Sequence, residues 1–501
     1  MSAKETPIAV FRADAAPAIG AGHVMRCLTL ANALREQGWH CAFACNREAR
    51  ETAPALAGSG FDILDCEATA DPVKLTEGWP GGCDQLVVDH YGLDAGLEAA
   101  CRGWSRHILV IDDLGDRRHD CDLLVDPTPD RSPGEYDPRV PETCGVLTGP
   151  DYAFVRPAFA MQNEKKPEPG PDIKRIFVGL GATDPDNATV RILAGLETVG
   201  AEIDVVLGAG AQNLDSVQRK VDLFGGRARL HTDLGPDELA HLMGQADLTI
   251  GAGGSSAWER CASGLPSLIV VIVENQRAVA DSLARHGAGI VLGDLETLAP
   301  RDVAAAVKGL EDEPVRLLQM SKSAAALCDG LGAERVAAMI AGKNPGNKSR
   351  IALRAVARAD SDTLLAWQQA PGARRYAHNP APPSTEEHRA WFQAQRTGPD
   401  SRLFIITCDG SPAGIIRLDQ GEPSNSLVVS ILVAGEFQKY GIGLSALSMA
   451  HGMWPAATFL ASVLPGNEAS HRLFRTAGYA PEDGPYYNYV RRSHDGSEQR
   501  A

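Results

Sequence analysis

Residues 19–26 read Ile-Gly-Ala-Gly-His-Val-Met-Arg, and this stretch decides how the first part of the chain folds. A strand-like run at 7–12 (PIAVFR) precedes it. Apolar residues at helical spacing follow it, namely Val24, Cys27, Leu28, Ala31 and Leu34. The pattern predicts a strand, a glycine turn and an amphipathic helix that starts near His23.

The position of His23 has two interpretations. Free N–H groups at a helix start attract anions, and the positive helix end disfavours imidazolium, which would keep the ring neutral and able to accept a proton. A histidine at a helix start is also commonly a surface or capping residue, and Gly-x-Gly alone is weak support for a site. The spacing leaves both roles open.

Composition limits the class of protein. The chain has 501 residues, 44% hydrophobic and 22% charged, as expected for about three globular domains. A formal charge of −16 and the lack of a basic run argue against a nucleic-acid partner. No apolar stretch is long enough to span a membrane and the first residues lack a signal pattern, so we expect a cytoplasmic protein without membrane insertion. The eleven cysteines show no Cys-x-x-Cys, which favours buried free thiols over disulfides or a zinc site.

Strands and helices alternate over residues 1–160, which predicts a parallel, doubly wound sheet. The expected strands are 7–12, 40–45, 61–66, 85–94, 107–114 and 121–127, with helices to about 37, near 47–58 and at 95–104. Ligands of such sheets collect at the carboxyl ends of the strands, where His23, Asp89, His90, Tyr91, Asp112 and Asp113 lie. Asp112 and Asp113 could instead cap the next element.

A Pro-rich, charged stretch at 160–172 is a predicted linker, after which a second α/β series runs from 173 to 341. Its expected strands are 174–180, 203–208, 227–234, 246–254 and 265–273, followed by a helical remainder. The turn at 251–256 could hold a diphosphate on backbone N–H groups, with Glu259 accepting bonds from ribose hydroxyls. Ser256-x-x-Glu259 also has the form of a capping box, and the spacing does not separate the two.

A second predicted linker, 342–349, precedes an α+β pattern over 350–492. Strands are expected at 350–356, 403–410, 411–419, 426–433 and 459–465, and helices at 360–370, 385–396, from 442 to about 453, and at 467–478. Gln438-x-x-Gly441-x-Gly443 between strand and helix forms a turn of N–H groups suited to a pyrophosphate. Asn467-x-x-Ser470 about 26 residues later strengthens that interpretation.

Five motifs in order resemble the UDP-sugar hydrolases of pseudaminic acid biosynthesis. They are Arg12-x-Asp14 with 19–28, Val88-Asp89-His90-Tyr91, Gly149-Pro150-x-Tyr152-Ala153 with Arg156-Pro157, Gly253-Gly254-Ser255-Ser256-x-Trp258-Glu259-Arg260, and Glu274-Asn275-Gln276. The resemblance implies two Rossmann-like domains in a glycosyltransferase-B-like arrangement. It also implies release of UDP from UDP-2,4-diacetamido-2,4,6-trideoxy-β-L-altropyranose by water. A departure is Gly181-Ala182-Thr183-Asp184, where many relatives have Gly-Gly-Ser-Asp.

The resemblance assigns roles residue by residue. His23 matches the general base that takes a proton from water, and Gly253, Gly254, Ser255, Ser256, Glu259 and Asn275 match the contacts to UDP. Asp14, Gly22, Arg26, Asp89, Tyr91 and Asn187 are pocket groups by position. UDP is already a good leaving group, so the site needs a base and donors for the growing charge, and no metal is expected.

Residues 350–490 resemble the GNAT acetyltransferases, especially those that act on amino-sugar nucleotides. The resemblance implies that acetyl-CoA pairs its pantetheine with 431–433, which includes Leu432 and Val433, and its pyrophosphate with Gln438, Gly441 and Gly443. Asn467 and Ser470 match positions that approach the cofactor. The tyrosine that many of these enzymes use as general acid falls on Phe474, so Tyr479, Tyr486 or Tyr487 must substitute or this part is slow or inactive.

Together these features predict a bifunctional sugar-nucleotide enzyme that acetylates a 4-amino UDP-sugar and then cleaves off UDP. The alternatives are a glycosyltransferase that passes the sugar to an acceptor, and a GNAT part that only senses or docks. The sequence fixes neither the stereochemistry of the sugar, which leaves the legionaminic acid and bacillosamine pathways open, nor the oligomeric state.

Overall fold

The computed structural model describes residues 6–17, 19–67, 72–165, 172–208, 210–343, 349–482 and 487–492. The chain divides into two compact units. The first comprises Met1–Asp116, Val125–Arg131 and Thr148–Ala333, and the second comprises Arg117–Leu124, Ser132–Leu147 and Glu334–Ala501. The boundaries drawn from the sequence, at 160/173 and 341/350, stay predictions.

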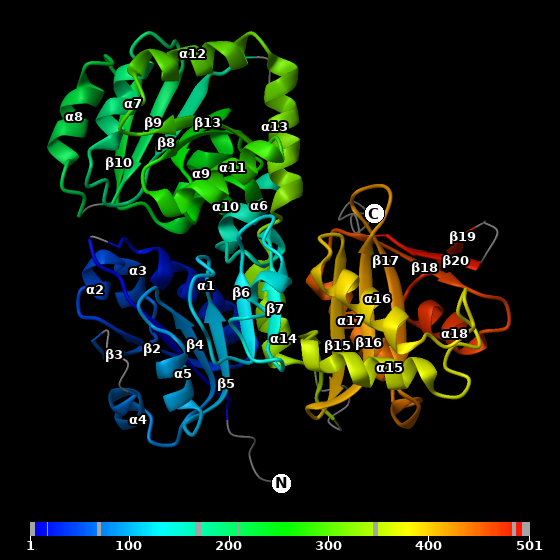
Figure 1. Ribbon diagram of the computed structural model, residues 1–501. Helices are drawn as coiled ribbons and strands as arrows, with labels where there is room; N and C mark the ends of the chain where they lie inside the picture. The colour runs from blue at the N-terminus through cyan, green and yellow to red at the C-terminus, as the bar shows by residue number, and fades with distance from the viewer. Residues whose placement is uncertain are drawn as a thin grey trace, which may run out of the picture. The chain divides into compact units, whose positions relative to one another are not determined.

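The first sheet has the strand order β3-β2-β1-β4-β5-β6-β7 (Figure 1). Its strands are β1 (Ile8–Ala13), β2 (His40–Cys45), β3 (Asp62–Asp65), β4 (Cys83–Asp89), β5 (Ser105–Ile111), β6 (Leu123–Asp126) and β7 (Gly145–Thr148). The associated helices are α1 (Gly22–Glu36), α2 (Ala49–Thr52), α3 (Pro54–Ala57), α4 (Val73–Gly78) and α5 (Ala95–Cys101). β1 pairs in parallel with both β2 and β4, so strands are added on one side of β1 up to β3 and on its other side from β4 onward. Ligands of open α/β sheets bind at such a switch point.

The second sheet has the order β10-β9-β8-β11-β12-β13, and all its neighbouring strands are parallel. Its strands are β8 (Arg175–Gly179), β9 (Glu202–Leu207), β10 (Ala228–Thr232), β11 (Leu248–Ala252), β12 (Ser267–Val271) and β13 (Gly289–Asp294). Its helices are α6 (Pro157–Lys165), α7 (Ala188–Leu196), α8 (Leu214–Asp222), α9 (Pro236–Gln245), α10 (Ser256–Ala262), α11 (Arg277–Arg285), α12 (Pro300–Glu311) and α13 (Pro314–Leu327).

Alternation along the strands gives the second sheet a core on each face. Val178 and Val270 pack with residues of α7, α8 and α12. Phe177 and Ile269, one position earlier on the same strands, pack with residues of α6, α9, α10 and α11. Because successive side chains point to opposite faces, a strand buried on both sides is apolar throughout, which is the pattern of 174–180 and 265–273.

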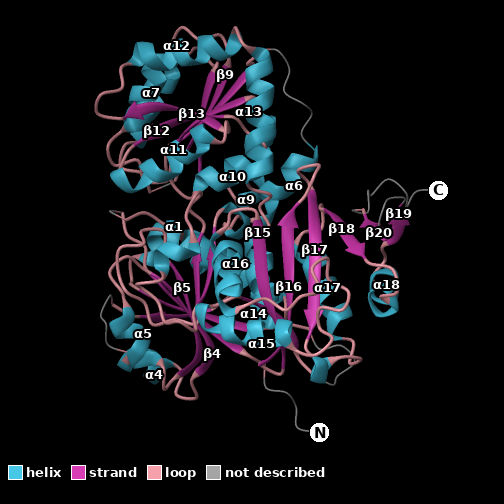
Figure 2. Cartoon of the chain, turned by 45° about the vertical axis from the view of Figure 1, so that its right-hand side comes forward, coloured by secondary structure: helices cyan, strands magenta, loops and turns pink. Residues whose placement is uncertain are grey.

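The third sheet, in the second unit, has the order β14-β15-β16-β17-β18-β20-β19 (Figure 2). Its strands are β14 (Ile351–Ala355), β15 (Ser401–Cys408), β16 (Ser411–Gln420), β17 (Ser426–Val433), β18 (Thr458–Val463), β19 (Ala480–Glu482) and β20 (Tyr487–Arg491). The helices of this part are α14 (Gly332–Ala341), α15 (Ser361–Gln369), α16 (Thr385–Thr397), α17 (Ile442–Met453) and α18 (Glu468–Thr476). The pairs are antiparallel except for the parallel pair β17–β18.

Residues 132–147 pack with the C-terminal part inside the second unit. The buried Arg396 donates to both carboxylate oxygens of Asp137, at 2.9 and 2.6 Å. The backbone N–H of Ala359 donates to the carbonyl of Glu142. A Cβ at Gly145 would lie 2.8 Å from Ala355 Cβ, so only glycine allows these two backbones to approach so closely. This association was not predicted.

Three expectations about elements were wrong. Residues 160–165 of the first predicted linker are helical, because α6 starts at Pro157 and continues to Lys165. The region after 273 is not wholly helical, because β13 extends the second sheet. The helix expected near 47–58 is split into α2 and α3 at Ala53, the residue before Pro54, since that position disfavours helical backbone. The predictions omitted α4, α8, β7, β19 and β20.

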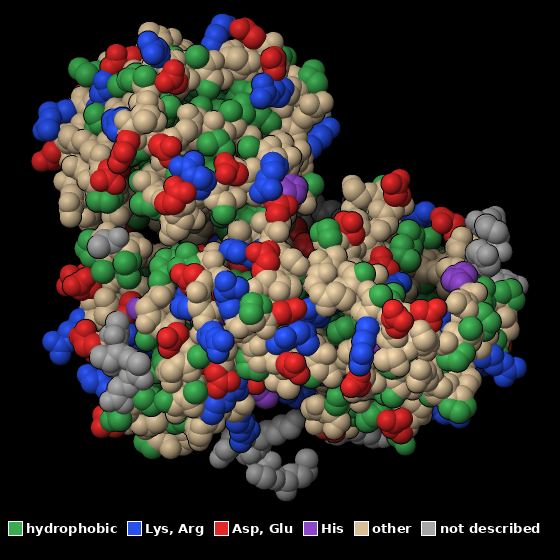
Figure 3. All heavy atoms as spheres, in the orientation of Figure 1, with side chains coloured by type: hydrophobic (Ala, Val, Ile, Leu, Met, Phe, Trp, Pro, Cys, Tyr) green, Lys and Arg blue, Asp and Glu red, His purple; other side chains and the backbone are tan. Residues whose placement is uncertain are grey.

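Surface and thiol features agree with the sequence. The eleven cysteines are all thiols, and all are buried apart from the half-buried Cys408. Figure 3 shows acidic and basic side chains interspersed on the face that it presents. In the described part of the chain, no helix is both long and apolar enough to cross a bilayer.

Candidate functional site

His23 lies at the switch point of the first sheet, as the second residue of α1. The apolar stripe from Val24 to Leu34 faces the core as predicted, since its members are at most 5% exposed. The imidazole is 7% exposed, and its ring meets that of Tyr91 edge-on at 4.4 Å between centroids. Tyr91 follows β4, so the two strands that border the switch point bring these rings together.

Arg26, one turn further along α1, holds two carboxylates. Its Nε and Nη2 each lie 2.6 Å from an oxygen of Asp89, and Nη1 lies 2.7 Å from Asp113. Asp89 is fully buried, while the side chain of Asp113 is 25% exposed. The predicted pocket groups Arg26 and Asp89 are therefore bonded to each other, and the cluster carries one net negative charge beside His23.

The environment of His23 favours the neutral ring. Burial lowers the pKa of His23 below its ordinary value of 6.5. The carboxylates of Asp89 and Asp113 act in the opposite direction, while Arg26 adds to the lowering. The lowered pKa supports the prediction that the His23 ring is neutral. Its largest cause is burial, whereas the prediction from the sequence rested on the positive end of the helix. A neutral, buried imidazole next to carboxylates can accept a proton and then be stabilised as imidazolium.

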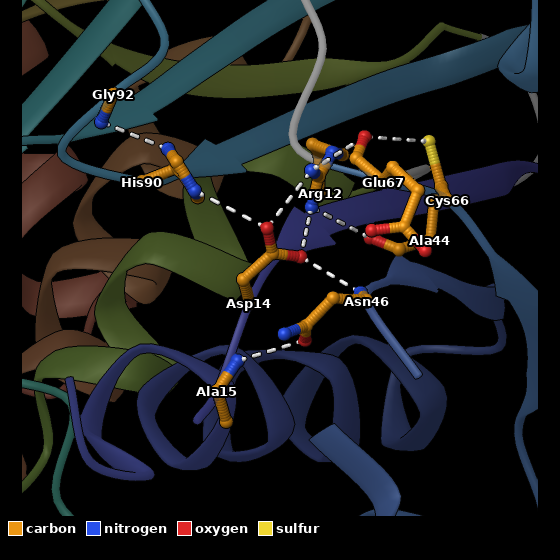
Figure 4. A network of polar contacts seen from close by, with 9 residues as sticks. All are labelled: Arg12, Asp14, Ala15, Ala44, Asn46, Cys66, Glu67, His90 and Gly92. Carbon is orange, nitrogen blue, oxygen red and sulfur yellow. Dashed lines mark hydrogen bonds and ion pairs between the residues drawn. The ribbon is translucent and has the colours of Figure 1, made fainter. Parts of the chain in front are cut away.

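Asp14 belongs to a separate buried network (Figure 4). Its carboxylate accepts from Arg12 Nη2 at 3.0 Å and from the backbone N–H of Asn46 at 2.8 Å, and it lies 3.2 Å from His90 Nε2. The Nδ1 of His90 accepts from the backbone N–H of Gly92, so the ring proton is on Nε2 and points to Asp14. Burial raises the pKa of Asp14, but the bonds from His90 and Arg12 outweigh it and hold that pKa well below its usual range.

Asp112 and Asp113 take different roles. Asp112 accepts from the backbone N–H groups of Leu114 and Gly115, so it closes the turn after β5 and does not cap a following helix or strand. Asp113 instead pairs with Arg26, and its Oδ1 is buried with no hydrogen-bond partner among the described residues. The sequence places Asp113 at the carboxyl end of a strand but assigns it no role in the site. The feature that could indicate a role is its position directly after a buried strand.

The turn at 251–256 connects β11 to α10 in the second sheet. Glu259 does not cap α10, because its Oε1 accepts from Arg156 Nε at 2.8 Å and Ser255 precedes the helix without a side-chain cap bond. The capping-box interpretation of Ser256-x-x-Glu259 is therefore wrong. Ser256 Oγ accepts from Arg260, and Ser255 is exposed.

The two glycine turns approach each other within the first unit. A Cβ at Gly22 would lie 3.5 Å from Ser255 Oγ. On the other side of the same turn, a Cβ at Gly253 would lie 2.6 Å from the carbonyl oxygen of Gln276, so Gly253 lets the 3-10 helix Glu274–Gln276 pack closely. Asn275 is exposed at the centre of that helix. The structure thus brings Gly22, Gly253 and Ser255 near one another.

Asn187 has a structural role. It precedes α7 with a left-handed backbone (φ +54°), and its Oδ1 accepts from Ser216. The helix start is capped from a distance by Asp184, which accepts from the N–H groups of Ala188 and Thr189. The capping role of Asp184 explains why an acid stands at the end of the sequence Gly181-Ala182-Thr183-Asp184.

In the second unit, β17 and β18 separate. They pair only from Ser426–Thr458 to Val428–Leu460, although β17 continues to Val433. Leu432 and Val433 pair with β16 but lie beyond the part of β17 that pairs with β18, and both are half-buried. Among the described residues, β17 has no pairing with β18 after Val428, so an extended ligand could pair with that edge of β17.

The turn after β17 has the expected form. Gln438 Nε2 donates to the carbonyl of Val433, and Gly441 adopts a left-handed backbone (φ +77°) immediately before α17, whose second residue is Gly443. Asn467 caps α18 through a bond from the N–H of Ser470, so its side chain is already used.

Phe474 lies in a buried aromatic cluster with Tyr479 and Tyr489. The hydroxyl of Tyr479 is 2.9 Å from His451 Nε2, and burial raises the pKa of Tyr479 while it lowers that of His451 to about 4. Tyr479 is 4% exposed, which does not suit a general acid for a bound thiolate. Tyr486 lies outside the described residues, as does the side chain of Tyr487.

No group of three or more His, Cys, Asp or Glu side chains is arranged to hold a metal ion in the part of the chain that the structure describes. The absence of a metal requirement stays a prediction.

Two family models match the chain. Residues 176–336 match the glycosyltransferase family 28 C-terminal domain, and residues 350–480 match the acetyltransferase (GNAT) domain. With the two parallel sheets of the first unit and the mixed sheet of the second, these matches confirm the fold predicted from the sequence: two Rossmann-like domains of glycosyltransferase-B type and a GNAT domain.

Three curated relatives are similar to the chain. The spore coat polysaccharide biosynthesis protein SpsG of Bacillus subtilis is 31% identical over 205 residues, which span 39% of this chain and only 58% of SpsG. An uncharacterized Methanocaldococcus jannaschii protein is 22% identical over 93% of this chain and 95% of its own length. The UDP-2,4-diacetamido-2,4,6-trideoxy-β-L-altropyranose hydrolase of Campylobacter jejuni is 26% identical over 56% of this chain and 96% of its own length. The chain thus joins a region homologous to this hydrolase and to SpsG with a C-terminal GNAT acetyltransferase domain.

Proposed function

We propose that the first unit hydrolyses a UDP-linked diacetamido sugar to UDP and the free sugar, with His23 as general base. The observation that carries the proposal is the buried imidazole of His23, whose pKa is lowered by burial, next to the Arg26 cluster and one residue from Gly22, which approaches Ser255. The similarity to the Campylobacter jejuni hydrolase supports water as the acceptor and its altropyranose as the sugar.

In this mechanism a water molecule attacks the anomeric carbon while His23 takes its proton. The bond from that carbon to the UDP oxygen breaks, and UDP leaves with the electron pair. The carboxylates of Asp89 and Asp113 stabilise the imidazolium that forms. The turn at 253–256, Glu259 and Asn275 would hold UDP, and Tyr91 would shape the sugar side of the pocket beside His23.

The decisive experiment incubates the protein with the UDP-sugar and no acceptor. Equal amounts of UDP and free sugar support hydrolysis, and mass spectrometry of a panel of UDP-diacetamido sugars identifies the stereochemistry. The match to a glycosyltransferase family 28 domain favours one alternative, transfer of the sugar to an acceptor. No turnover without an acceptor, together with UDP release when a candidate acceptor is added, would support that alternative.

For the second unit we propose N-acetylation of the 4-amino group of a UDP-amino sugar by acetyl-CoA. The separated ends of β17 and β18 and the turn at 438–443 support binding of the pantetheine and pyrophosphate parts. The amine would attack the thioester carbonyl, and the CoA thiolate would leave and be protonated. Since Tyr479 is buried, the acid is unassigned. Thiol release that requires the amino sugar supports catalysis, and its complete absence supports a sensor or docking role.

A further inference from the structure

The guanidinium of Arg260 is buried beneath the turn at 251–256. It is 1% exposed, and no carboxylate lies within ion-pair distance of it among the described residues. Its hydrogen bonds go to neutral acceptors: the carbonyl of Ala252 at 2.7 Å, Ser256 Oγ at 3.1 Å and Ser267 Oγ at 3.2 Å. Burial lowers the pKa of Arg260 to about 10, which still leaves it charged at neutral pH. A buried charge without a counter-charge is costly, so its position calls for an explanation.

The backbone is shaped to hold this cation close. A Cβ at Gly251 would lie 2.7 Å from Arg260 Nη1, so any larger residue would push the guanidinium away from the turn. The nearest acid in sequence, Glu259, is bonded to Arg156 at 2.8 Å and makes no ion pair with Arg260, although its charge raises the pKa of Arg260. The positive charge under the turn is therefore left without a paired acid.

The bond to Ser256 also orients that hydroxyl. Because Ser256 Oγ accepts from Arg260 Nη1, its own hydrogen is free to donate to a ligand. The other side of the turn is open, since Gly254 is half-buried and Ser255 exposed. A cation below and hydroxyl and N–H donors above suit a ligand that carries negative charge.

We propose that Arg260 is the counter-charge for the diphosphate of the bound nucleotide, acting through the turn and through Ser256 without touching the ligand. It is a positioning residue. The inference rests on the proposed function, because it assigns the diphosphate to this turn. It predicts that Arg260 discriminates by charge, so that it strengthens binding of UDP but not of uridine.

The test compares UDP and uridine binding to the full chain by titration calorimetry, with uridine also measured by competition against UDP. Arg260→Met is expected to weaken UDP binding at least about tenfold and uridine binding less than about twofold. Arg260→Lys, which keeps the charge, should retain most of the preference for UDP. The matched control Ser267→Ala removes one hydrogen bond from Arg260 but no charge, and should leave the ratio of the two affinities unchanged.

Equal losses of UDP and uridine affinity in Arg260→Met would overturn the proposal, since they indicate a purely structural role. A ratio of UDP to uridine affinity that is the same in Arg260→Met as in the wild type would likewise overturn the proposal. If Arg260→Met does not fold, Arg260→Gln carries the same expectation, with circular dichroism as the check. If the wild-type protein binds UDP with the expected preference but releases none from UDP-sugars, the proposed hydrolysis fails while the role of Arg260 stands. If the wild type does not prefer UDP to uridine, the role of Arg260 is refuted.

Discussion

Replacement of Arg26 by methionine tests whether this residue is a structural counter-charge or a free pocket group. The fully buried Asp89 takes two bonds of 2.6 Å from Arg26. Removing one partner of a buried ion pair costs about 3–5 kcal/mol, because the other charge stays buried alone. Asp113→Asn removes a charge whose side chain is 25% exposed and leaves the Arg26–Asp89 pair in place, which predicts a loss of about 1 kcal/mol or less.

Native-state hydrogen exchange measured by mass spectrometry can read these two costs locally, which avoids treating a chain of two units as two-state. Peptides from α1 and β4 should exchange roughly two to four orders of magnitude faster in Arg26→Met and up to about fivefold faster in Asp113→Asn. Peptides from α16, in the second unit, serve as the internal control. Replacing both Arg26 and Asp89 by apolar residues should restore most of the protection. Equal effects of the two single variants, or less than a tenfold effect of Arg26→Met, would refute the reasoning.

Three further predictions concern activity and the buried tyrosine. His23→Asn should abolish UDP release with UDP affinity nearly unchanged by calorimetry, and full activity would remove His23 as the base. Because the pKa of His23 is lowered and the base must be neutral, the acidic midpoint of kcat/KM for UDP release should lie below pH 6.5, whereas a midpoint above 6.5 would contradict the burial argument. Tyr479→Phe should cost about 1–3 kcal/mol in the unfolding of the second unit, measured by urea denaturation, because His451 loses its buried partner. The same variant should keep its acetyl-transfer rate, and loss of that rate alone would identify Tyr479 as the acid.

Most of the fold follows from local sequence patterns. The apolar run at 7–12 identifies a strand, and the helical spacing of apolar residues after His23 identifies an amphipathic helix. The glycines between them identify the turn. β13 was missed although Gly287, with a left-handed backbone, separates it from α11, because its short sequence, GIVLGD, lies between helical segments. The α6 helix escaped because the linker assignment included its end, and Pro157 was not recognised as a helix start.

The site was predictable only as far as its residues interact locally. His23, Tyr91 and the turn at 253–256 are visible as motifs. The pairing of Glu259 with Arg156 joins positions 103 residues apart, and it overrides a capping box that the spacing allows. Likewise, only the folded structure shows that the hydroxyl of Tyr479 is hydrogen-bonded to His451, because nothing in the sequence near either residue indicates the contact.

The packing of residues 132–147 in the second unit determines how this protein can be taken apart. A cut within 342–349 would leave Asp137 on one fragment and Arg396, whose side chain is 4% exposed, on the other. A GNAT domain expressed from residue 350 onward would then lack the carboxylate that accepts two hydrogen bonds from Arg396. Dissection experiments and chimeric proteins should therefore keep the segment around Asp137 together with the GNAT domain, because both belong to one compact unit.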